Sequence, residues 1–172
     1  MIFSKLLATA VRKALVWSAN RIAVVARKNA SWSTTIPKAI SVGTVEGDEN
    51  RMSITISVDE KIAPHAMAFE KGSGIHGEKG KTYVIKPRNV GALAFDWKGG
   101  PEASELWGSN KFLGVGRGGK LLFKFVDHPG VEARPFLAPA LNNSISAILN
   151  RFSGAAVEAL DDSLGVKVEI IR

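Results

Sequence analysis

The sequence contains no cysteine, which excludes disulfides, zinc–cysteine sites and thiol catalysis. It has only three histidines, His65, His76 and His128, and none of them stands in an HxxxH or HExxH pattern. We therefore predict neither a metal site built from protein side chains nor a bound cofactor. The length of 172 residues suits one domain with a buried core, and we expect that domain to span residues 1–172.

Acidic residues are missing from the first 45 positions, although this stretch holds seven basic residues. The remainder of the chain carries 16 basic and 16 acidic residues, so the net charge of +7 belongs to the N-terminal segment. The cations that we assign to a basic face are Lys5, Arg12, Lys13, Arg21, Arg27 and Lys28. Such a face attracts a negative partner, which could be nucleic acid, an anionic membrane or the acidic surface of another protein.

Long hydrophobic runs are also missing. Lys5, the pair Arg12-Lys13 and the pair Asn20-Arg21 interrupt the apolar residues at the N-terminus. A signal-peptide core or a membrane span is therefore not predicted, and no lipidation motif is present. A transit peptide shares the acid-free, basic and amphipathic character of this segment and stays an alternative.

Catalytic patterns are equally scarce. No GxSxG elbow occurs, and the nearest carboxylate–histidine pair is Asp127-His128. Neighbouring residues on a strand point to opposite faces, so these two side chains are not expected to bond to each other. The acidic residues Glu102, Glu105, Asp161 and Asp162 stand where loops and helix ends usually carry solvated charge. We therefore predict that the protein is not an enzyme.

Nucleotide and DNA motifs are not found either. The glycines of residues 114–119 do not have GxGxxG spacing, and a predicted strand follows them instead of a helix. No helix-turn-helix, zinc-finger or RNP pattern is present, so sequence-specific recognition is not predicted. A non-specific nucleic-acid-binding module remains an alternative because of the basic face.

The patterns that are present predict an α+β fold. Apolar residues at i, i+3 and i+4 spacing indicate a long amphipathic helix over residues 3–29 and a second helix over 134–160. Alternating residues predict a hairpin of strands 39–45 and 51–58. Further short elements are a helical turn at 62–74, strands at 82–87, 92–97 and 120–126, a glycine-rich loop at 98–119 and a terminal strand at 166–171. We expect both long helices to pack on one face of a mainly antiparallel sheet that spans residues 39–126.

Residues 128–141 form the junction that leads into the second helix. Proline fixes φ and glycine tolerates positive φ, so Pro129-Gly130 predicts a turn. Pro135 and Pro139 suit the opening turn of a helix, where a missing N–H costs little. Phe136 is expected to press this turn into the core.

Two segments together resemble a known protein family. The first is Ala63-Pro64-His65-Ala66-Met67-Ala68-Phe69-Glu70-Lys71-Gly72, and the second is His128-Pro129-Gly130 followed by Arg134-Pro135-Phe136-Leu137-Ala138-Pro139-Ala140. In their order and spacing they resemble the "AP-x-A-x-x-x-E-x-G" and "HPG…RPF-x-PA" segments of the tail-completion, or head–tail joining, proteins of long-tailed bacteriophages. These proteins are also described as putative phage morphogenesis proteins. The resemblance covers roughly residues 6–152.

The resemblance implies a structural role in the phage neck. A member of this family would form a ring, sixfold or alternatively twelvefold, between the portal–adaptor assembly of the head and the tail terminator or tail tube. It would assemble in the host cytoplasm, reside in the virion and lie near packaged DNA, with no membrane partner. A tail terminator or another minor tail protein is an alternative reading. For contacts between subunits or with partners we select Trp107, Phe112, Arg117 and Arg134.

Overall fold

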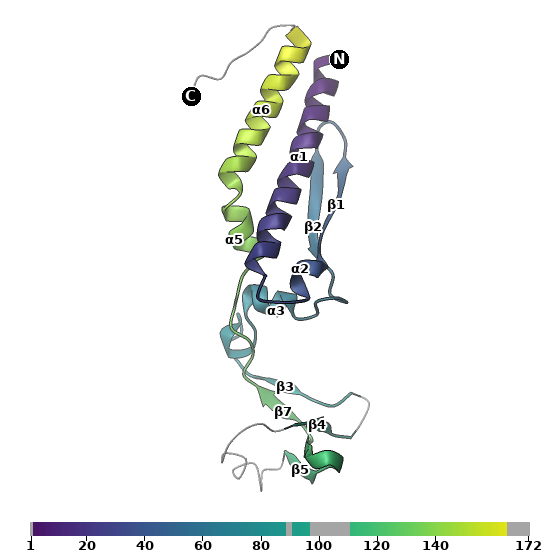
Figure 1. Cartoon of the computed structure of the whole chain (residues 1–172), viewed down its shortest axis with the longest axis vertical. Helices are drawn as coiled ribbons and strands as arrows, with labels where there is room; N and C mark the ends of the chain where they lie inside the picture. The colour runs from purple at the N-terminus through teal and green to yellow at the C-terminus, as the bar shows by residue number, and fades with distance from the viewer. Residues whose placement is uncertain (1, 89–90, 97–110, 165–172) are drawn as a thin grey trace. The chain divides into compact units, whose positions relative to one another are not determined.

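The computed structural model describes residues 2–88, 91–96 and 111–164 (Figure 1). The chain groups into two compact units. The helical unit comprises the residues up to Glu70 together with those from Arg134 onward, and the second unit comprises Lys71–Ala133. That the two units form one domain stays a prediction from the sequence.

The helical unit is built around the N-terminal helix α1 (Ile2–Asn29). Figure 1 shows α1 between a hairpin, made of β1 (Ile40–Gly47) and β2 (Met52–Val58), and the C-terminal helix α6 (Ile145–Leu164). Three short helices complete the unit: α2 (Ile36–Ala39), α3 (Ala66–Lys71) and α5 (Leu137–Asn142). The expected α+β fold, with both long helices on the same side of the hairpin, is confirmed.

Small side chains allow α1 and α6 to approach each other closely. Ala14 and Ser18 on α1 and Ala155 and Ala159 on α6 are all buried. The Ser18 hydroxyl donates a hydrogen bond of 2.7 Å to the carbonyl oxygen of Ala14, so burial leaves this polar group satisfied. The helix that the amphipathic periodicity predicts is therefore present, and alanine rather than leucine makes its closest contacts with α6.

The main core lies where the end of α1 meets the hairpin, α2, α3 and α5. Phe136 and Ile36 are its largest fully buried side chains. Ile40 is buried beside them, and Ile56 and Val58 of β2 pack against the same cluster. The expectation that Phe136 presses the junction into the core is confirmed.

Strand β2 alternates along its length as predicted, whereas β1 alternates only up to Val42. Its register pairs Ile40 with Val58 and Gly47 with Met52, with a bulge between Val42 and Val45. Gly47 has a φ of 98°, and a Cβ there would lie 2.0 Å from the carbonyl oxygen of Arg51. Glycine is therefore required at this turn.

The C-terminal helix predicted at 134–160 is divided into α5 and α6. The amide of Ser144 donates to the carbonyl oxygen of Leu141, three residues earlier, so the chain tightens between the two helices. The Ser144 hydroxyl donates to the carbonyl oxygen of Ala140 at 2.8 Å, which is the kind of local bond that bends helices. The helix continues past its predicted end at 160 to Leu164, so Asp161 and Asp162 belong to its last turn.

The second unit contains short strands and 3₁₀ turns. Its strands are β3 (Tyr83–Ile85), β4 (Leu93–Phe95), β5 (Phe112–Val115), β6 (Leu121–Phe123) and β7 (Val126–His128). Its 3₁₀ turns are Gly74–His76 and Arg117–Gly119. The strands pair antiparallel as β3–β7 and as β4–β6–β5.

Among the described residues, the single sheet predicted for residues 39–126 is therefore replaced by three small sheets. The strand predicted at 120–126 ends at Phe123, and a separate strand begins at Val126 and pairs with β3 instead. Of the loop predicted at 98–119, residues 98–110 lie outside the described residues, and residues 112–115 form β5 instead of loop. The terminal strand predicted at 166–171 lies outside the described residues.

Among residues 2–88, 91–96 and 111–164, no helix combines the length and hydrophobicity that a membrane span requires.

Candidate functional site

The two sequence segments that carry the family resemblance meet at the beginning of α5. Helix α3 places the Glu70 carboxylate beside this helix end, where Oε2 accepts hydrogen bonds from the amides of Phe136 at 2.7 Å and Leu137 at 3.0 Å. Oε1 accepts a third bond from the amide of Ala138 at 2.9 Å. A carboxylate at this position satisfies amides that have no partner within the helix and interacts favourably with the helix dipole.

Two further bonds hold the same junction. The amide of Arg134 donates to the carbonyl oxygen of Phe69 at 2.6 Å, and the side-chain amide of Asn29 donates to the carbonyl oxygen of Phe136 at 3.2 Å. From the sequence, Glu70 was assigned only to the helical turn predicted at 62–74. The structure assigns Glu70 to a helix that begins 67 residues later in the chain, a partner that no local pattern identifies.

The His128-Pro129-Gly130 turn packs against residues 73–75 in the second unit. The amide of Ile75 donates to the carbonyl oxygen of Pro129 at 2.7 Å. Gly130 has a φ of 105°, and a Cβ there would lie 1.9 Å from the carbonyl oxygen of Ser73. The predicted turn is confirmed, and the close approach explains why glycine stands at this position.

The imidazole ring of His128 stabilises this turn. Its Nδ1 accepts a hydrogen bond of 2.9 Å from the amide of Gly130, and the ring stacks on Tyr83 with centroids 5.1 Å apart. Asp127, the neighbouring carboxylate, is paired instead with Lys111. The separation of Asp127 and His128 expected from the strand geometry is thus observed.

The other residues of the two motifs lie in the core, beside helix ends or at the surface. Ala63 is buried, and Gly72 has a φ of 76° directly after α3, as expected for a helix cap. Pro64 lies two residues before α3, which begins at Ala66. Pro139 lies in the first turn of α5, whereas Pro135 precedes that helix and is exposed.

Of the four residues selected for subunit contacts, one belongs to the helical unit, two belong to the second unit and one lies outside the described residues. Arg134 is exposed and its guanidinium lies 5.7 Å from the ring centroid of Trp32 within the helical unit. Arg117 is exposed in a 3₁₀ turn of the second unit. Phe112 is not an aromatic residue on a loop, because it belongs to β5 and its ring packs 5.4 Å from the buried Phe123. Trp107 lies outside the described residues.

The basic residues of α1 divide into two groups. Arg12 and Arg27 face the hairpin, where they donate to the carbonyl oxygens of Val45 at 3.3 Å and Ile40 at 2.8 Å. The others are exposed at the surface of the helix: Lys5, Lys13, Arg21 and Lys28. Part of the predicted basic face therefore stabilises the packing of the hairpin on α1.

Apolar side chains accompany the exposed cations. Trp17 is 39% exposed, and the Arg21 guanidinium lies 5.6 Å from its ring centroid. Val16 and Val24 are also exposed. A shallow hollow of about 520 Å³ lies here, lined by Arg12, Lys13, Val16, Trp17, Asn20 and Arg151. Sequence reasoning missed these apolar residues because it considered only the charges outside the stripe.

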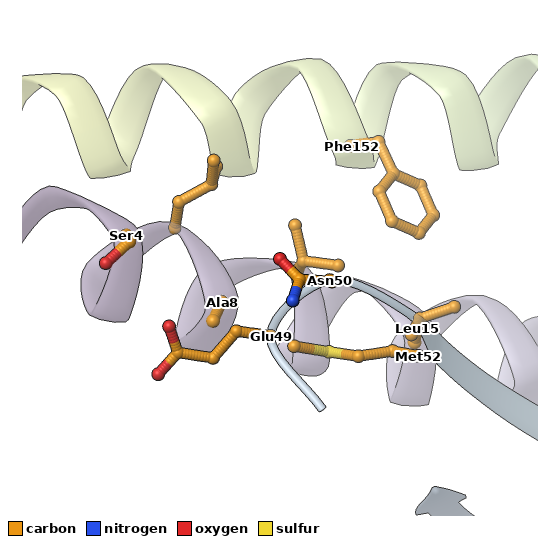
Figure 2. A pocket seen from close by; sticks show the side chains of 9 residues that line it. Ser4, Ala8, Leu15, Glu49, Asn50, Met52 and Phe152 are labelled. Atoms are coloured by element: carbon orange, nitrogen blue, oxygen red, sulfur yellow. The ribbon is translucent and has the colours of Figure 1, made fainter. Parts of the chain in front are cut away.

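A second hollow, also of about 520 Å³, opens on another side of α1 (Figure 2). Leu7, Val11 and Leu15 of α1 form one wall, and Phe152 of α6 forms another. Glu49 and Asn50, from the turn of the hairpin, are the polar groups that this turn contributes to its lining. The hollow is thus largely an apolar groove between the two helices and the hairpin turn.

Within the described part of the chain, no group of three or more histidine, cysteine, aspartate or glutamate side chains could hold a metal ion. The surfaces described above offer cationic and apolar contacts. Comparison with protein-family models, with curated proteins and with solved structures found no match.

Proposed function

We propose that this protein is a structural subunit of the neck of a long-tailed bacteriophage, in which copies form a ring between the head and the tail. The observation that carries the proposal is the contact between Glu70 and the amides of residues 136–138. The two segments that resemble the phage family are joined by these bonds. Their joint occurrence therefore has a structural reason, which supports a shared fold.

The proposed subunit acts by contact and without a catalytic step. A ring closes when each copy presents two different surfaces to its neighbours, one to the copy before and one to the copy after. The ring, sixfold or twelvefold, would bind the portal–adaptor assembly on one side and the tail terminator or tail tube on the other, with packaged DNA passing through it.

The exposed cations of α1 support a protein contact more than a DNA contact. Val16, Trp17 and Val24 lie among these cations, and exposed aromatic and aliphatic side chains are typical of protein interfaces. A channel lined with cations would also retard the passage of DNA. We therefore assign this face of α1 to an acidic or apolar protein surface.

Electron micrographs of particles assembled without the protein test the proposal. The expected result is full heads and free tails that fail to join. Joined, infectious particles would contradict the proposal. Heads that carry tails of uncontrolled length would instead favour a tail terminator, because a terminator stops growth of the tube.

Non-specific binding to nucleic acid is the second candidate, since Lys13, Arg21 and Lys28 are exposed on a helix with no acidic residue. A gel shift with nucleic acid at about 100 mM salt would favour this second function, provided that the affinity falls with rising salt concentration as steeply as several phosphate contacts require. The neck proposal expects no such shift for the protein at that salt concentration.

A further inference from the structure

The groove between α1, α6 and the hairpin turn exposes apolar side chains (Figure 2). Leu7, Val11 and Leu15 of α1, Met52 of β2 and Phe152 of α6 line it, and all five are only partly buried. Figure 2 shows the ring of Phe152 pointing from α6 into this space. A contiguous apolar surface of this kind marks a place where another segment or molecule binds.

The apolar surface continues from the groove onto α6. Leu149 is 62% exposed, Leu160 is 37% exposed and Leu164 is 65% exposed. At 3.6 residues per turn, Leu149 and Leu160 lie about 60° and 80° from Phe152 around the helix, in the same direction. The three leucines therefore extend the wall that Phe152 begins. We call the groove together with Leu149, Leu160 and Leu164 the leucine groove.

The ion pair of α6 lies on another side of the helix. Arg151 is about 100° from Phe152 in the direction away from the leucines, and it lines the other hollow of α1. Its guanidinium lies 3.9 Å from the carboxylate of Glu158. This pair therefore does not interrupt the leucine groove, and the side of α6 beside Phe152 is suited to an apolar occupant.

The leucine groove has about the length of the chain segment that follows it. Residues 165–172 lie outside the described residues and come directly after Leu164, at one end of the groove. Leu149 and Leu164 are separated by about 22 Å along the helix axis at 1.5 Å per residue. Eight residues of extended chain reach about 26 Å. The segment is therefore long enough to return along α6 as far as Leu149.

The sequence of this segment is Gly165-Val166-Lys167-Val168-Glu169-Ile170-Ile171-Arg172. Valine and isoleucine favour extended chain, in which alternate side chains point to the same face. Val166, Val168 and Ile170 would then form one wholly apolar face. A glycine directly after a helix commonly takes the left-handed conformation that turns the chain back, and Gly165 has this position.

We propose that residues 165–172 occupy the leucine groove of their own chain, extended along α6 with Val166, Val168 and Ile170 toward Phe152 and the leucines. This occupant is favoured over a separate partner because it begins at the end of the groove, has the required length and carries a matching apolar face. The inference goes beyond the proposed function and does not depend on it. It implies that contacts between subunits use other surfaces of the helical unit.

Cysteine cross-linking of the full chain tests the contact, because the protein has no cysteine of its own. Val11→Cys in the groove is combined with Val168→Cys in the segment, and a short bis-maleimide reagent joins the two thiols. The matched control combines Val168→Cys with Val16→Cys, since Val16 lies on the same helix but lines the other hollow. Far-UV circular dichroism verifies that both double variants fold. We expect the Val11 pair to cross-link within one chain about tenfold faster than the Val16 pair, because docking raises the effective concentration of the two thiols.

An apolar dye gives a second measurement that needs no cross-link. The dye ANS fluoresces on exposed apolar protein surface. Val168→Asp should release the segment from the groove and raise ANS fluorescence by about twofold or more. The adjacent Lys167→Asp introduces the same side chain on the opposite face of the extended segment and should leave the fluorescence unchanged.

Other outcomes would overturn the inference. Equal cross-linking of the Val11 and Val16 pairs, or no cross-linking of the Val11 pair, would show that the segment does not occupy the groove. Cross-links that join two chains instead of one would assign the groove to the segment of a second copy. An equal rise in ANS fluorescence for Lys167→Asp and Val168→Asp would contradict the assigned apolar face. The proposed neck function is tested separately by the micrographs and is unaffected by these results.

Discussion

The Glu70 carboxylate accepts a hydrogen bond of 2.7 Å from the amide of Phe136, and this bond connects two segments that are 66 residues apart. Phe136 is 1% exposed and is the largest side chain of the core. The bond therefore fixes the point where the returning chain enters the helical unit. Loss of the carboxylate would leave partly buried amides without their acceptor.

We expect Glu70→Ala to lower the free energy of unfolding of the helical unit by about 2 kcal/mol, because bonds to a charged group are the stronger ones and unsatisfied amides are costly. Glu70→Gln should have a smaller effect, since one acceptor oxygen remains. Urea denaturation followed by far-UV circular dichroism measures both. The matched control is Glu60→Ala at an exposed position, with an expected change within about 0.5 kcal/mol. Equal effects at Glu60 and Glu70 would contradict the assigned cap.

The close approach of Gly130 to Ser73 gives a second prediction. Gly130→Ala would place a Cβ 1.9 Å from a carbonyl oxygen, and its positive φ adds strain, so we expect a loss of about 3 kcal/mol or more. Gly118→Ala separates the two causes, because Gly118 has a φ of 77° and a Cβ there meets nothing within 4 Å. This control should cost about 1 kcal/mol. Hydrogen exchange of the amides in residues 71–133 reports the difference, and similar losses at both glycines would refute the steric explanation.

The sequence was informative where the signal is local. The 3.6-residue period predicted α1 almost to its ends, and alternation predicted the hairpin of β1 and β2. These patterns are sufficient because each element buries one face against its immediate neighbours.

Other features depend on partners that are distant in the chain. Strand β7 pairs with β3 and strand β6 pairs with β4, and these partners are distant in the chain. The single strand predicted at 120–126 is therefore two strands, β6 and β7. Phe112 was placed on a loop because glycines surround it, yet its contact with Phe123 supports a strand. The Glu70 cap was missed for the same reason, since its acceptor and donors are far apart in sequence.

The attachment of the hairpin to α1 gives a third prediction. Arg27 is half-buried and its Nη2 lies 2.8 Å from the carbonyl oxygen of Ile40, at the beginning of β1. We expect Arg27→Ala to lower the free energy of unfolding by about 1–2 kcal/mol, through the lost bond and the lost packing of its side chain. Lys28→Ala removes the same charge from an exposed neighbour and should change stability by less than about 0.5 kcal/mol. If Arg27→Ala changed the free energy of unfolding as little as Lys28→Ala, Arg27 would be a surface residue that does not hold the hairpin to α1.

The contact between α1 and α6 gives a fourth prediction, in which substitutions at two adjacent residues change the free energy of unfolding in opposite directions. Ala155 is 1% exposed, so Ala155→Leu should overfill the contact and lower the free energy of unfolding by about 1–3 kcal/mol. Gly154, one position earlier, lies inside α6, and a Cβ there would meet no atom within 4 Å, so Gly154→Ala should raise stability by about 0.5–1 kcal/mol. Thermal unfolding followed by far-UV circular dichroism compares the two. Both changes add only aliphatic groups to the same helix, so a loss confined to Ala155→Leu would be explained by the close packing of Ala155 against α1, whereas stabilisation by both would mean that the two helices are not closely packed.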